Sequence, residues 1–315
     1  KVKSTAMILY GIYVVFTVIE IIALLIAGMP LFDSMTLTFG TVGTGGFGLL
    51  NSSIASYSTA VQIIITVFMI ICSINFTVYY MFLIKRPKEA LMCEEMRYYL
   101  LIVFGSALLI AFNIRACFDS FGKAFQQAIF QVASVISTTG FATADFNLWP
   151  EFSRMILVLL MFVGACAGST GGGIKVSRLI IMVKSVRNEI MSVTHPRSVQ
   201  KVHMDGRRIP DNVVKTVLCY LAGYVVVLIV SVLLISLDNF DMTTNFTAVM
   251  ATFNNIGPGL NLVGPTGNFG GFSVLSKLVL MFDMLVGRLE LFPMLVIFAP
   301  GLWRIHSHRH VGKVQ

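Results

Sequence analysis

The stretch Asn254-Asn255-Ile256-Gly257-Pro258-Gly259-Leu260 decides the fold, together with two stretches that resemble it. These two are Gly43-Thr44-Gly45-Gly46-Phe47 and Ser137-Thr138-Thr139-Gly140-Phe141. Each is short, polar and glycine-bearing, and each follows a mildly apolar segment that lies between two long hydrophobic runs. Polar backbone at membrane depth is tolerated only where it is buried in protein or lines a water-filled path. Three such stretches in one chain therefore predict the wall of a pore.

The composition indicates a membrane protein. Of the 315 residues, 56% are hydrophobic and 12% are charged, and the mean hydropathy is +0.84. A soluble domain carries about 25% charged residues, so this chain lacks the charge to cover a water-facing surface. The five cysteines are scattered and form neither a disulfide framework nor a metal-spaced set. The first hydrophobic run is too long for a signal peptide and lacks a cleavage site.

Hydrophobic runs predict six membrane-spanning helices, because a span needs roughly 20 apolar residues. These runs lie at about 6–28, 60–84, 98–114, 155–183, 213–237 and 274–301. Three weaker segments, at about 31–42, 120–136 and 242–253, are too short to span and suit re-entrant half-helices. The order of span, half-helix, polar stretch and span occurs three times. We therefore expect an all-α integral membrane protein with three consecutive helix–pore-helix–helix repeats.

The repeats are expected over residues 1–90, 91–184 and 213–315, the last including a C-terminal tail, with a basic loop at 185–212. Most of the 23 Lys and Arg residues lie in the segments 1–5, 85–97, 178–215 and 302–315. The positive-inside tendency then predicts that both termini are cytoplasmic and that the polar stretches open from the outside. The basic segment 178–215 suits either anionic lipid headgroups or a cytosolic partner.

The three stretches contain the residue types of a cation filter built from main-chain oxygens. A ring of carbonyls replaces the hydration shell of a K+ ion without a fixed charge that would trap it. Glycine permits the backbone angles that turn carbonyls toward an axis. One Gly-Phe pair is an ordinary turn, but three in matching positions predict a filter. The predicted filter residues are Gly43, Thr44, Gly45, Gly46, Ser137, Thr138, Thr139, Gly140, Asn254, Asn255, Ile256 and Gly257. The predicted K+ contacts are Thr44, Gly45, Thr138, Thr139, Asn255 and Ile256.

The segment 164–175 interrupts the fourth hydrophobic run with five glycines. Each glycine costs a helix interior up to about 1 kcal/mol relative to alanine, so we expect the helix to break. A phosphate-binding loop is excluded because Lys175 lies between Ile174 and Val176, where that motif needs Gly-Lys followed by Ser or Thr. The two remaining interpretations are a packing patch of small residues and, favoured here, a flexible gate below the filter. The predicted gate residues are Gly168, Ser169, Thr170, Gly171, Gly172, Gly173, Lys175 and Arg288.

Arg288 lies within the last hydrophobic run. A central arginine costs roughly 2.5–3.5 kcal/mol on insertion scales and faces a cavity in most cases. We expect it to face the pore below the filter, where it repels cations or holds the gate through backbone carbonyls. The alternative is a structural ion pair with Glu290, Asp283 or Glu20. Neither a catalytic triad nor a paired-carboxylate arrangement is recognisable, so we expect no enzyme activity.

These motifs resemble the Trk/Ktr/HKT superfamily of potassium transporters, and most closely its bacterial TrkH-type subunits. The resemblance implies a pseudo-fourfold, K+-channel-like fold in which Gly46, Gly140 and Gly257 are filter glycines of the second, third and fourth repeats. It also implies that 164–175 is the intramembrane gating loop and that Arg288 is the pore arginine. The expected setting is the bacterial inner membrane. Expected partners are the lipid bilayer, a second copy of the chain and a cytosolic nucleotide-binding regulatory subunit of the TrkA/KtrA type. Neither an organic cofactor nor nucleic acid is expected.

The sequence departs from that family in one respect, since it contains three repeats where the family has four. The abrupt cationic start favours truncation. The filter position of the missing first repeat matters for the selectivity for K+ over Na+. The sequence does not distinguish channel-like transport from transport coupled to H+ or Na+. Besides K+ uptake, two other functions are compatible with the sequence: a secondary transporter for a small solute with a broken-helix site, and a non-conducting truncated remnant. The first would need inverted repeats, whereas all three units here share one orientation.

Overall fold

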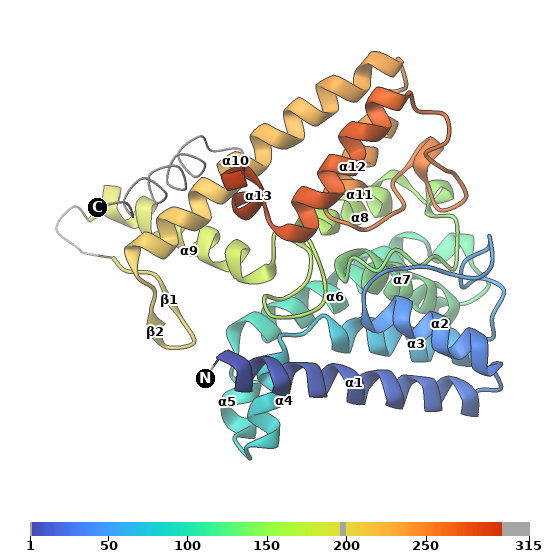
Figure 1. Cartoon of the computed structure of the whole chain (residues 1–315), viewed down its shortest axis with the longest axis horizontal. Helices are drawn as coiled ribbons and strands as arrows, with labels where there is room; N and C mark the ends of the chain where they lie inside the picture. Colours follow the sequence, from blue (N-terminus) through green and yellow to red (C-terminus); the bar gives the residue numbers. More distant parts are fainter. Residues whose placement is uncertain (1, 196–199, 298–315) are drawn as a thin grey trace, which may run out of the picture.

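The computed structural model describes residues 2–195 and 200–297, and these fold into helices in three consecutive groups (Figure 1). The first group contains α1 (Val2–Ile26), α2 (Leu31–Val42), α3 (Thr59–Cys72), α4 (Phe76–Leu83) and α5 (Pro87–Leu91). The second contains α6 (Glu94–Asn113), α7 (Phe121–Ile136), α8 (Glu151–Val163) and α9 (Val176–Thr194). The third contains α10 (Asp211–Ile235), α11 (Met242–Phe253), α12 (Val274–Leu289) and α13 (Leu291–Ile297).

Short 3-10 turns and one small hairpin connect these helices. The turns are η1 (Arg115–Cys117), η2 (Phe146–Leu148), η3 (Ser236–Asp238) and η4 (Asn261–Val263). In the basic segment, β1 (His203–Met204) pairs antiparallel with β2 (Arg207–Arg208). The expected boundary between 184 and 185 falls inside α9. The basic segment 302–315 lies outside the described residues.

The three short helices begin and end at local signals in the sequence. The side chain of Ser120 accepts a hydrogen bond from the Lys123 amide at the start of α7, and Asp241 accepts one from Thr244 at the start of α11. At the start of α2 stands Pro30, which cannot donate a backbone hydrogen bond. All three helices end where a polar, glycine-bearing stretch begins. Helices α2, α7 and α11 thus occupy the segments that the hydrophobicity pattern marks as too short to span.

Two of the hydrophobic runs expected to span the membrane are not single continuous helices. The run 60–84 bends by 87° between α3 and α4, where the Asn75 side chain accepts a hydrogen bond from Thr77 and caps the second helix. The run 274–301 is interrupted at Glu290, whose φ is +65°. Pro293 accounts for that interruption, because a proline in a continuous helix would remove the hydrogen bond to Leu289, whereas the first turn of a new helix tolerates it.

Among the described residues, three helical segments are long and apolar enough to cross a bilayer. They are Met7–Ile26, Glu94–Asn113 and Asp211–Asp238, and the bent pair α3–α4 makes a fourth if it is counted as one span. On α1 the polar residues Thr17 and Glu20 are buried, while Val18 and Ile19 are about half exposed. This distribution is inverted relative to a soluble protein, and it suits a helix whose outer face contacts lipid.

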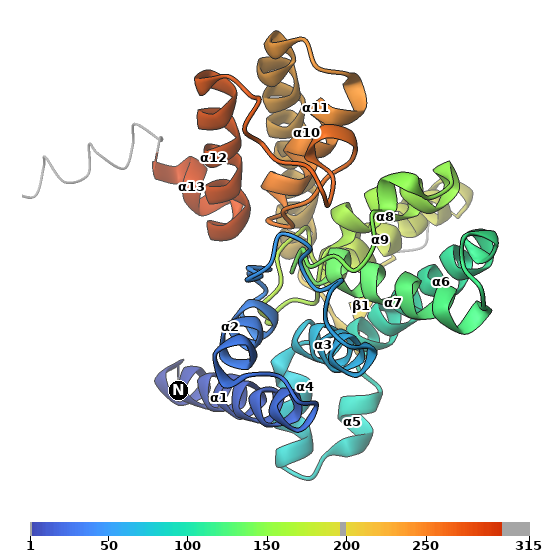
Figure 2. The same ribbon diagram turned by 90° about the vertical axis from the view of Figure 1, so that its right-hand side faces the viewer.

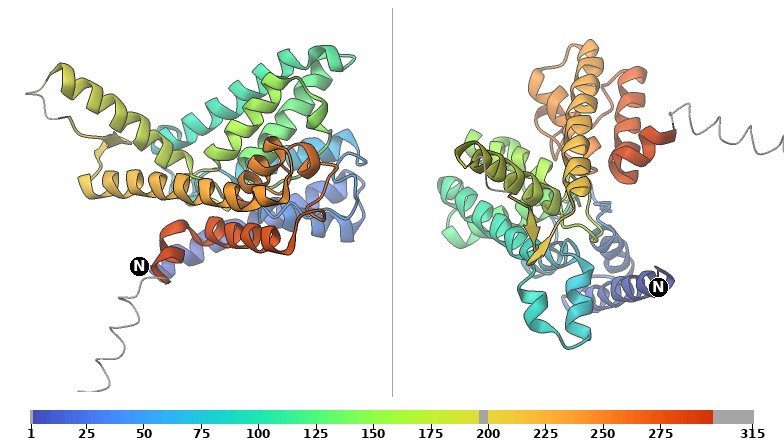
Figure 3. Two further views of the ribbon diagram at one scale, coloured as in Figure 1. Left: turned by 90° about the horizontal axis from the view of Figure 1, so that it is seen from above. Right: turned by 90° about the vertical axis from the view of Figure 1, so that its left-hand side faces the viewer.

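The three groups surround the loops that follow α2, α7 and α11 (Figure 2). Helix α3 packs against α7, which joins the first group to the second, and α11 contacts α8, which joins the second to the third. The views from above and from the side in Figure 3 show α10 and α12 running roughly alongside each other. The ends of the short helices are therefore held together in the middle of the molecule.

Candidate functional site

The three glycine-bearing stretches have the same backbone hydrogen bonds. We name residues 43–46, 137–140 and 254–257 the first, second and third strips. In each strip the amides of the third and fourth residues both donate to one carbonyl oxygen near the end of the preceding helix. Those acceptors are Gly40, Ser134 and Ala251, at N···O distances of 2.8–3.4 Å. Because the pattern repeats atom for atom, the three strips share one conformation.

That conformation needs unusual backbone angles at two of the four positions. The second residues Thr44, Thr138 and Asn255 have φ of 51°, 59° and 56°. The fourth residues Gly46, Gly140 and Gly257 have φ of 66°, 86° and 105°. Left-handed φ is uncommon for a β-branched residue such as threonine, and such strain persists where the surroundings enforce it, often at functional sites.

Neighbouring strips lie in direct backbone contact. A Cβ atom added to Gly46 would lie 1.7 Å from the carbonyl oxygen of Thr139, and one added to Gly140 would lie 1.8 Å from that of Ile256. No side chain fits at either glycine. The Thr139 carbonyl of the second strip therefore packs directly against Gly46, and the Ile256 carbonyl of the third strip packs directly against Gly140. All three fourth-position glycines line one cavity of about 240 Å³, which Pro258 and Phe269 also line.

The side between the third strip and the first is open. A Cβ at Gly257 would meet nothing within 4 Å. A groove of about 1050 Å³ lies there between the first and third helix groups. It is lined by residues 43–45 of the first strip, residues 255–257 of the third, and Met284 and Arg288 from α12. The strips therefore enclose their common centre on three sides.

Residues 164–175 form a loop, here named the glycine loop, that contacts all three strips. The Thr44 hydroxyl donates to the carbonyl oxygen of Thr170 at 2.9 Å, and the Gly172 amide donates to the Thr138 hydroxyl at 2.6 Å. A Cβ at Gly172 would also lie 2.8 Å from the carbonyl oxygen of Asn254 in the third strip. Helix α8 ends at Val163 and α9 begins at Val176, so the loop replaces helix over the predicted break.

Two cationic side chains contact the glycine loop. The Arg288 guanidinium donates to the carbonyl oxygen of Thr170 at 3.3 Å, and the Lys175 ammonium donates to that of Gly171. Arg288 is the penultimate residue of α12, so it lies at a helix end rather than in the middle of a span.

The ion-pair partners considered for Arg288 are engaged elsewhere or unpaired. Glu290 pairs with Arg178 at 2.8 Å, and Asp283 accepts a hydrogen bond from Ser231 at 2.8 Å. Within the described residues, both carboxylate oxygens of Glu20 lack a hydrogen-bond partner. Arg288 is thus attached to the glycine loop and not to a carboxylate.

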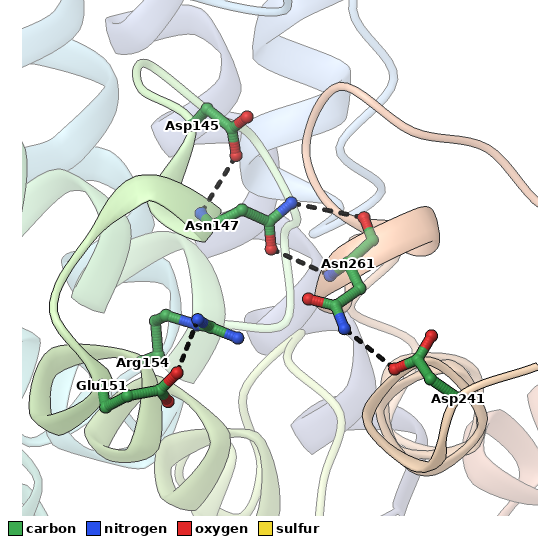
Figure 4. Close-up of polar contacts among 6 residues, drawn as sticks. All are labelled: Asp145, Asn147, Glu151, Arg154, Asp241 and Asn261. Atoms are coloured by element: carbon green, nitrogen blue, oxygen red, sulfur yellow. Dashed lines mark hydrogen bonds and ion pairs between the residues drawn. The ribbon is translucent and has the colours of Figure 1, made fainter.

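A polar brace beyond the strips joins the second helix group to the third (Figure 4). The Asn147 side chain accepts from the Asn261 amide at 2.9 Å and donates to the Asn261 carbonyl at 3.3 Å. The Asn261 side chain in turn donates to Asp241, the cap of α11, at 2.8 Å. An Arg154–Glu151 pair lies nearby on α8. No sequence pattern marks this brace, because asparagines in loops are ordinary turn residues.

The strips, the glycine loop and the long apolar helices together define a helical membrane protein in which three glycine-bearing strips line one cavity. A sequence model of a family described as "TrkH: Cation transport protein" matches residues 1–115 and 118–305. The chain belongs to this family. The resemblance to TrkH-type proteins is therefore confirmed, and the family is one of transport proteins and not of enzymes.

Named relatives agree with the family. The chain is 35% identical to the Trk system potassium uptake protein TrkH of Salmonella typhimurium over 311 residues, which are 96% of this chain and 63% of that protein. The TrkH protein of Vibrio parahaemolyticus is 34% identical, again over 311 residues and 64% of its length. The crystal structure of the potassium transporter TrkH from Vibrio parahaemolyticus superposes with a TM-score of 0.88, covering 96% of this chain and 65% of that one. The chain thus spans less than two thirds of the relatives it matches.

Proposed function

We propose that this chain contributes to K+ uptake across a membrane through a filter of backbone carbonyls. The observation that carries the proposal is the contact between strips, in which Gly46 and Gly140 each receive a neighbour's carbonyl oxygen where a side chain would otherwise lie. Carbonyl oxygens that converge on one centre replace the hydration shell of a K+ ion. The predicted K+ contacts are the backbones of residues 44–45, 138–139 and 255–256, next to these glycines.

In this proposal each helix group is one helix–pore-helix–helix repeat, with α2, α7 and α11 as the pore helices. Their C-terminal ends carry partial negative charge and precede the strips directly, which favours a cation at the centre. A fourth unit of the same kind covers the open groove between the first and third groups. The volume of that groove and the greater length of the relatives support this step.

The glycine loop is the gate in this proposal, and Arg288 holds it beneath the strips. The hydrogen bonds from Thr44, Gly172 and Arg288 support this role, because they place the loop against the strips. Opening then requires that the loop leave these partners. The guanidinium also adds positive charge near the path and lowers cation occupancy there.

The setting that we propose is a bacterial inner membrane, with the basic segments on the cytoplasmic side. The proposed partners are a second copy of the chain and a cytosolic nucleotide-binding subunit. The names of the relatives support this setting, since they are Trk system proteins. The hairpin β1–β2 with α9 offers a basic surface that includes Arg187, Arg207 and Arg208.

The second candidate is a chain that does not itself conduct and only assembles with partners. The groove of about 1050 Å³ favours this candidate, because three strips leave the fourth side of the path unwalled. A small-solute transporter is less well supported, because the cavity that the strips share is only about 240 Å³ and drug-sized ligands occupy roughly 300–1,000 Å³.

Growth at limiting K+ tests both candidates. A bacterial strain without K+ uptake systems would receive this chain alone or joined to a fourth unit taken from a TrkH relative. We expect growth and rubidium uptake with the fourth unit. Uptake by the chain alone would contradict the requirement for a covered groove. Failure of both forms, with normal amounts in the membrane, would contradict K+ transport.

A further inference from the structure

Glu95, in the first turn of α6, is a buried carboxylate that none of the predicted motifs includes. The residue is 2% exposed, although its side chain ends in a carboxyl group. A buried charge is costly unless it is paired or fully hydrogen-bonded, so its partners should explain its position. All three of its hydrogen-bond partners are donors, as suits an ionised carboxylate.

One of these donors lies within the glycine loop, and another lies just after it. Glu95 Oε1 accepts from the Ala167 amide at 2.7 Å and from the Ser177 amide at 3.1 Å. Ser177 lies in the first turn of α9, whose own capping residue Lys175 provides no side-chain cap. Glu95 therefore places a carboxylate from α6 at the start of α9, which favours negative charge. One of its oxygen atoms binds the loop at Ala167 and the first turn of the following helix at Ser177.

The third donor belongs to the break between α3 and α4. Asn75 Nδ2 donates to Glu95 Oε2 at 3.3 Å, while Asn75 Oδ1 caps α4 by accepting from Thr77 at 2.9 Å. Three more hydrogen bonds join this break to the loop. They run from Cys166 N to Ser73 O, from Phe76 N to Gly168 O, and from Thr170 Oγ1 to Cys72 O.

We propose that Glu95 is the positioning residue that latches the glycine loop in its closed place. The proposal rests on the gating role assigned to the loop above. Glu95 links Ala167 in the loop, Ser177 just after it and the broken helix of the preceding group, so the loop leaves the strips only when these contacts open. Arg288 holds the same loop from the opposite helix group, through a single hydrogen bond.

The donor and acceptor pattern offers a reciprocal test. In Glu95→Gln the new amide group would face the Asn75 amide group, donor against donor. In Asn75→Asp the new carboxylate keeps the cap on α4 but faces Glu95, acceptor against acceptor. The double variant moves the charge to position 75 and restores every donor–acceptor pair. If Glu95 and Asn75 only filled space, the single variants would show no defect and the double variant no rescue, because the exchanged side chains are nearly the same size.

Hydrogen–deuterium exchange measures the latch without relying on transport. The intact protein in lipid nanodiscs would be compared with each variant over peptides that cover residues 164–177. We expect about tenfold faster exchange in each single variant, since each loses a charge-assisted hydrogen bond and gains a repulsive contact. The double variant should return to the wild-type rate. Glu94→Gln is the matched control, because Glu94 pairs with Lys184 and does not contact the loop.

The outcomes separate the latch from the transport function. Unchanged exchange in both single variants, or a double variant no slower than Glu95→Gln, would overturn the latch. If Glu95→Gln does not fold, the double variant decides: recovery of folded protein with wild-type exchange supports the latch, and no recovery overturns it. Rubidium flux recorded in parallel should rise in the single variants and fall again in the double. If no form conducts while the exchange pattern holds, the latch stands and the K+ transport proposal fails.

Discussion

The Arg288 guanidinium donates a hydrogen bond of 3.3 Å to the carbonyl oxygen of Thr170, although the two residues are 118 positions apart in the sequence. This contact joins the end of α12 in the third helix group to a loop of the second. Thr170 also accepts from Thr44 in the first group. The backbone carbonyl of Thr170 thus connects the three helix groups, so we expect substitutions of its hydrogen-bond donors to have large effects.

Arg288→Ala should raise basal K+ flux about fivefold. The substitution removes one hydrogen bond to the loop. Because the side chain is exposed to the groove, we take the value of an ordinary hydrogen bond, about 1 kcal/mol, and not the larger value of a buried charged one. Rubidium uptake into proteoliposomes, by the chain joined to the fourth unit, measures the effect. Lys277→Ala is the control, since Lys277 lines the same groove but donates to Gly270. Unchanged flux at equal protein amounts would show that Arg288 has no part in gating.

Gly46→Ala should abolish flux and reduce the yield of folded protein. The new Cβ would overlap the Thr139 carbonyl oxygen at 1.7 Å and also needs an unfavourable positive φ. Overpacking alone costs about 1–3 kcal/mol, and here a backbone atom must move. Gly105→Ala, in α6 with nothing within 4 Å, should stabilise the helix by up to about 1 kcal/mol. Thermal unfolding in detergent compares the two, and a Gly46→Ala protein as stable as wild type would refute the close contact between strips.

Thr138→Val should weaken the attachment of the glycine loop to the second strip. The Gly172 amide donates to the Thr138 hydroxyl at 2.6 Å, and valine leaves this buried donor unpaired at a cost of about 1–3 kcal/mol. Thr138→Ser keeps the hydroxyl and serves as the control. Chemical denaturation and exchange of the loop amides report the change. Equal stability of the valine and serine variants would argue against this hydrogen bond.

Acid should loosen the polar brace of Figure 4 through Asp241. Hydrogen bonds from the Thr244 hydroxyl and amide, together with the Asn261 side chain, hold the pKa of this carboxyl below its usual value. A depressed pKa means that the stabilisation is complete above the unfolded value of about 3.9 and is lost as pH falls through the folded value. Melting temperatures should therefore drop more steeply for wild type than for Asp241→Asn as the pH falls from about 5 to about 2. Parallel profiles for the two proteins would contradict this role.

The short helices could be predicted from the sequence because their boundaries are local. Ser120 and Asp241 cap their helices with their own side chains, and hydrophobic length separates these helices from spans. The filter and gate residues remain predictions, although the strips and the glycine loop lie together as that interpretation requires. The family assignment was within reach of the sequence because its motifs are specific in combination.

The bend between α3 and α4 could not be predicted, because its causes are distant in the sequence. The segment Ser73-Ile74-Asn75 contains neither glycine nor proline, and its hydropathy continues that of the flanking helices. Its free backbone groups find partners in the glycine loop, about 90 residues later. The contacts of Glu95 could not be predicted either, because a carboxylate in the first turn of a helix is common and shows no sequence pattern of its own.

That bend has a consequence for how the loop moves. The carbonyl oxygens of Cys72 and Ser73 are released by the end of α3 and accept hydrogen bonds from Thr170 and Cys166. If the loop moved away, these oxygens would lose their hydrogen-bond donors at membrane depth, where each unpaired polar group costs several kcal/mol. Water must therefore reach these carbonyl oxygens at the same time as the glycine loop moves away. Under the proposed gating, the conducting state is therefore a wetted one, and osmotic pressure, which withdraws water from cavities, should shift the protein toward its resting form.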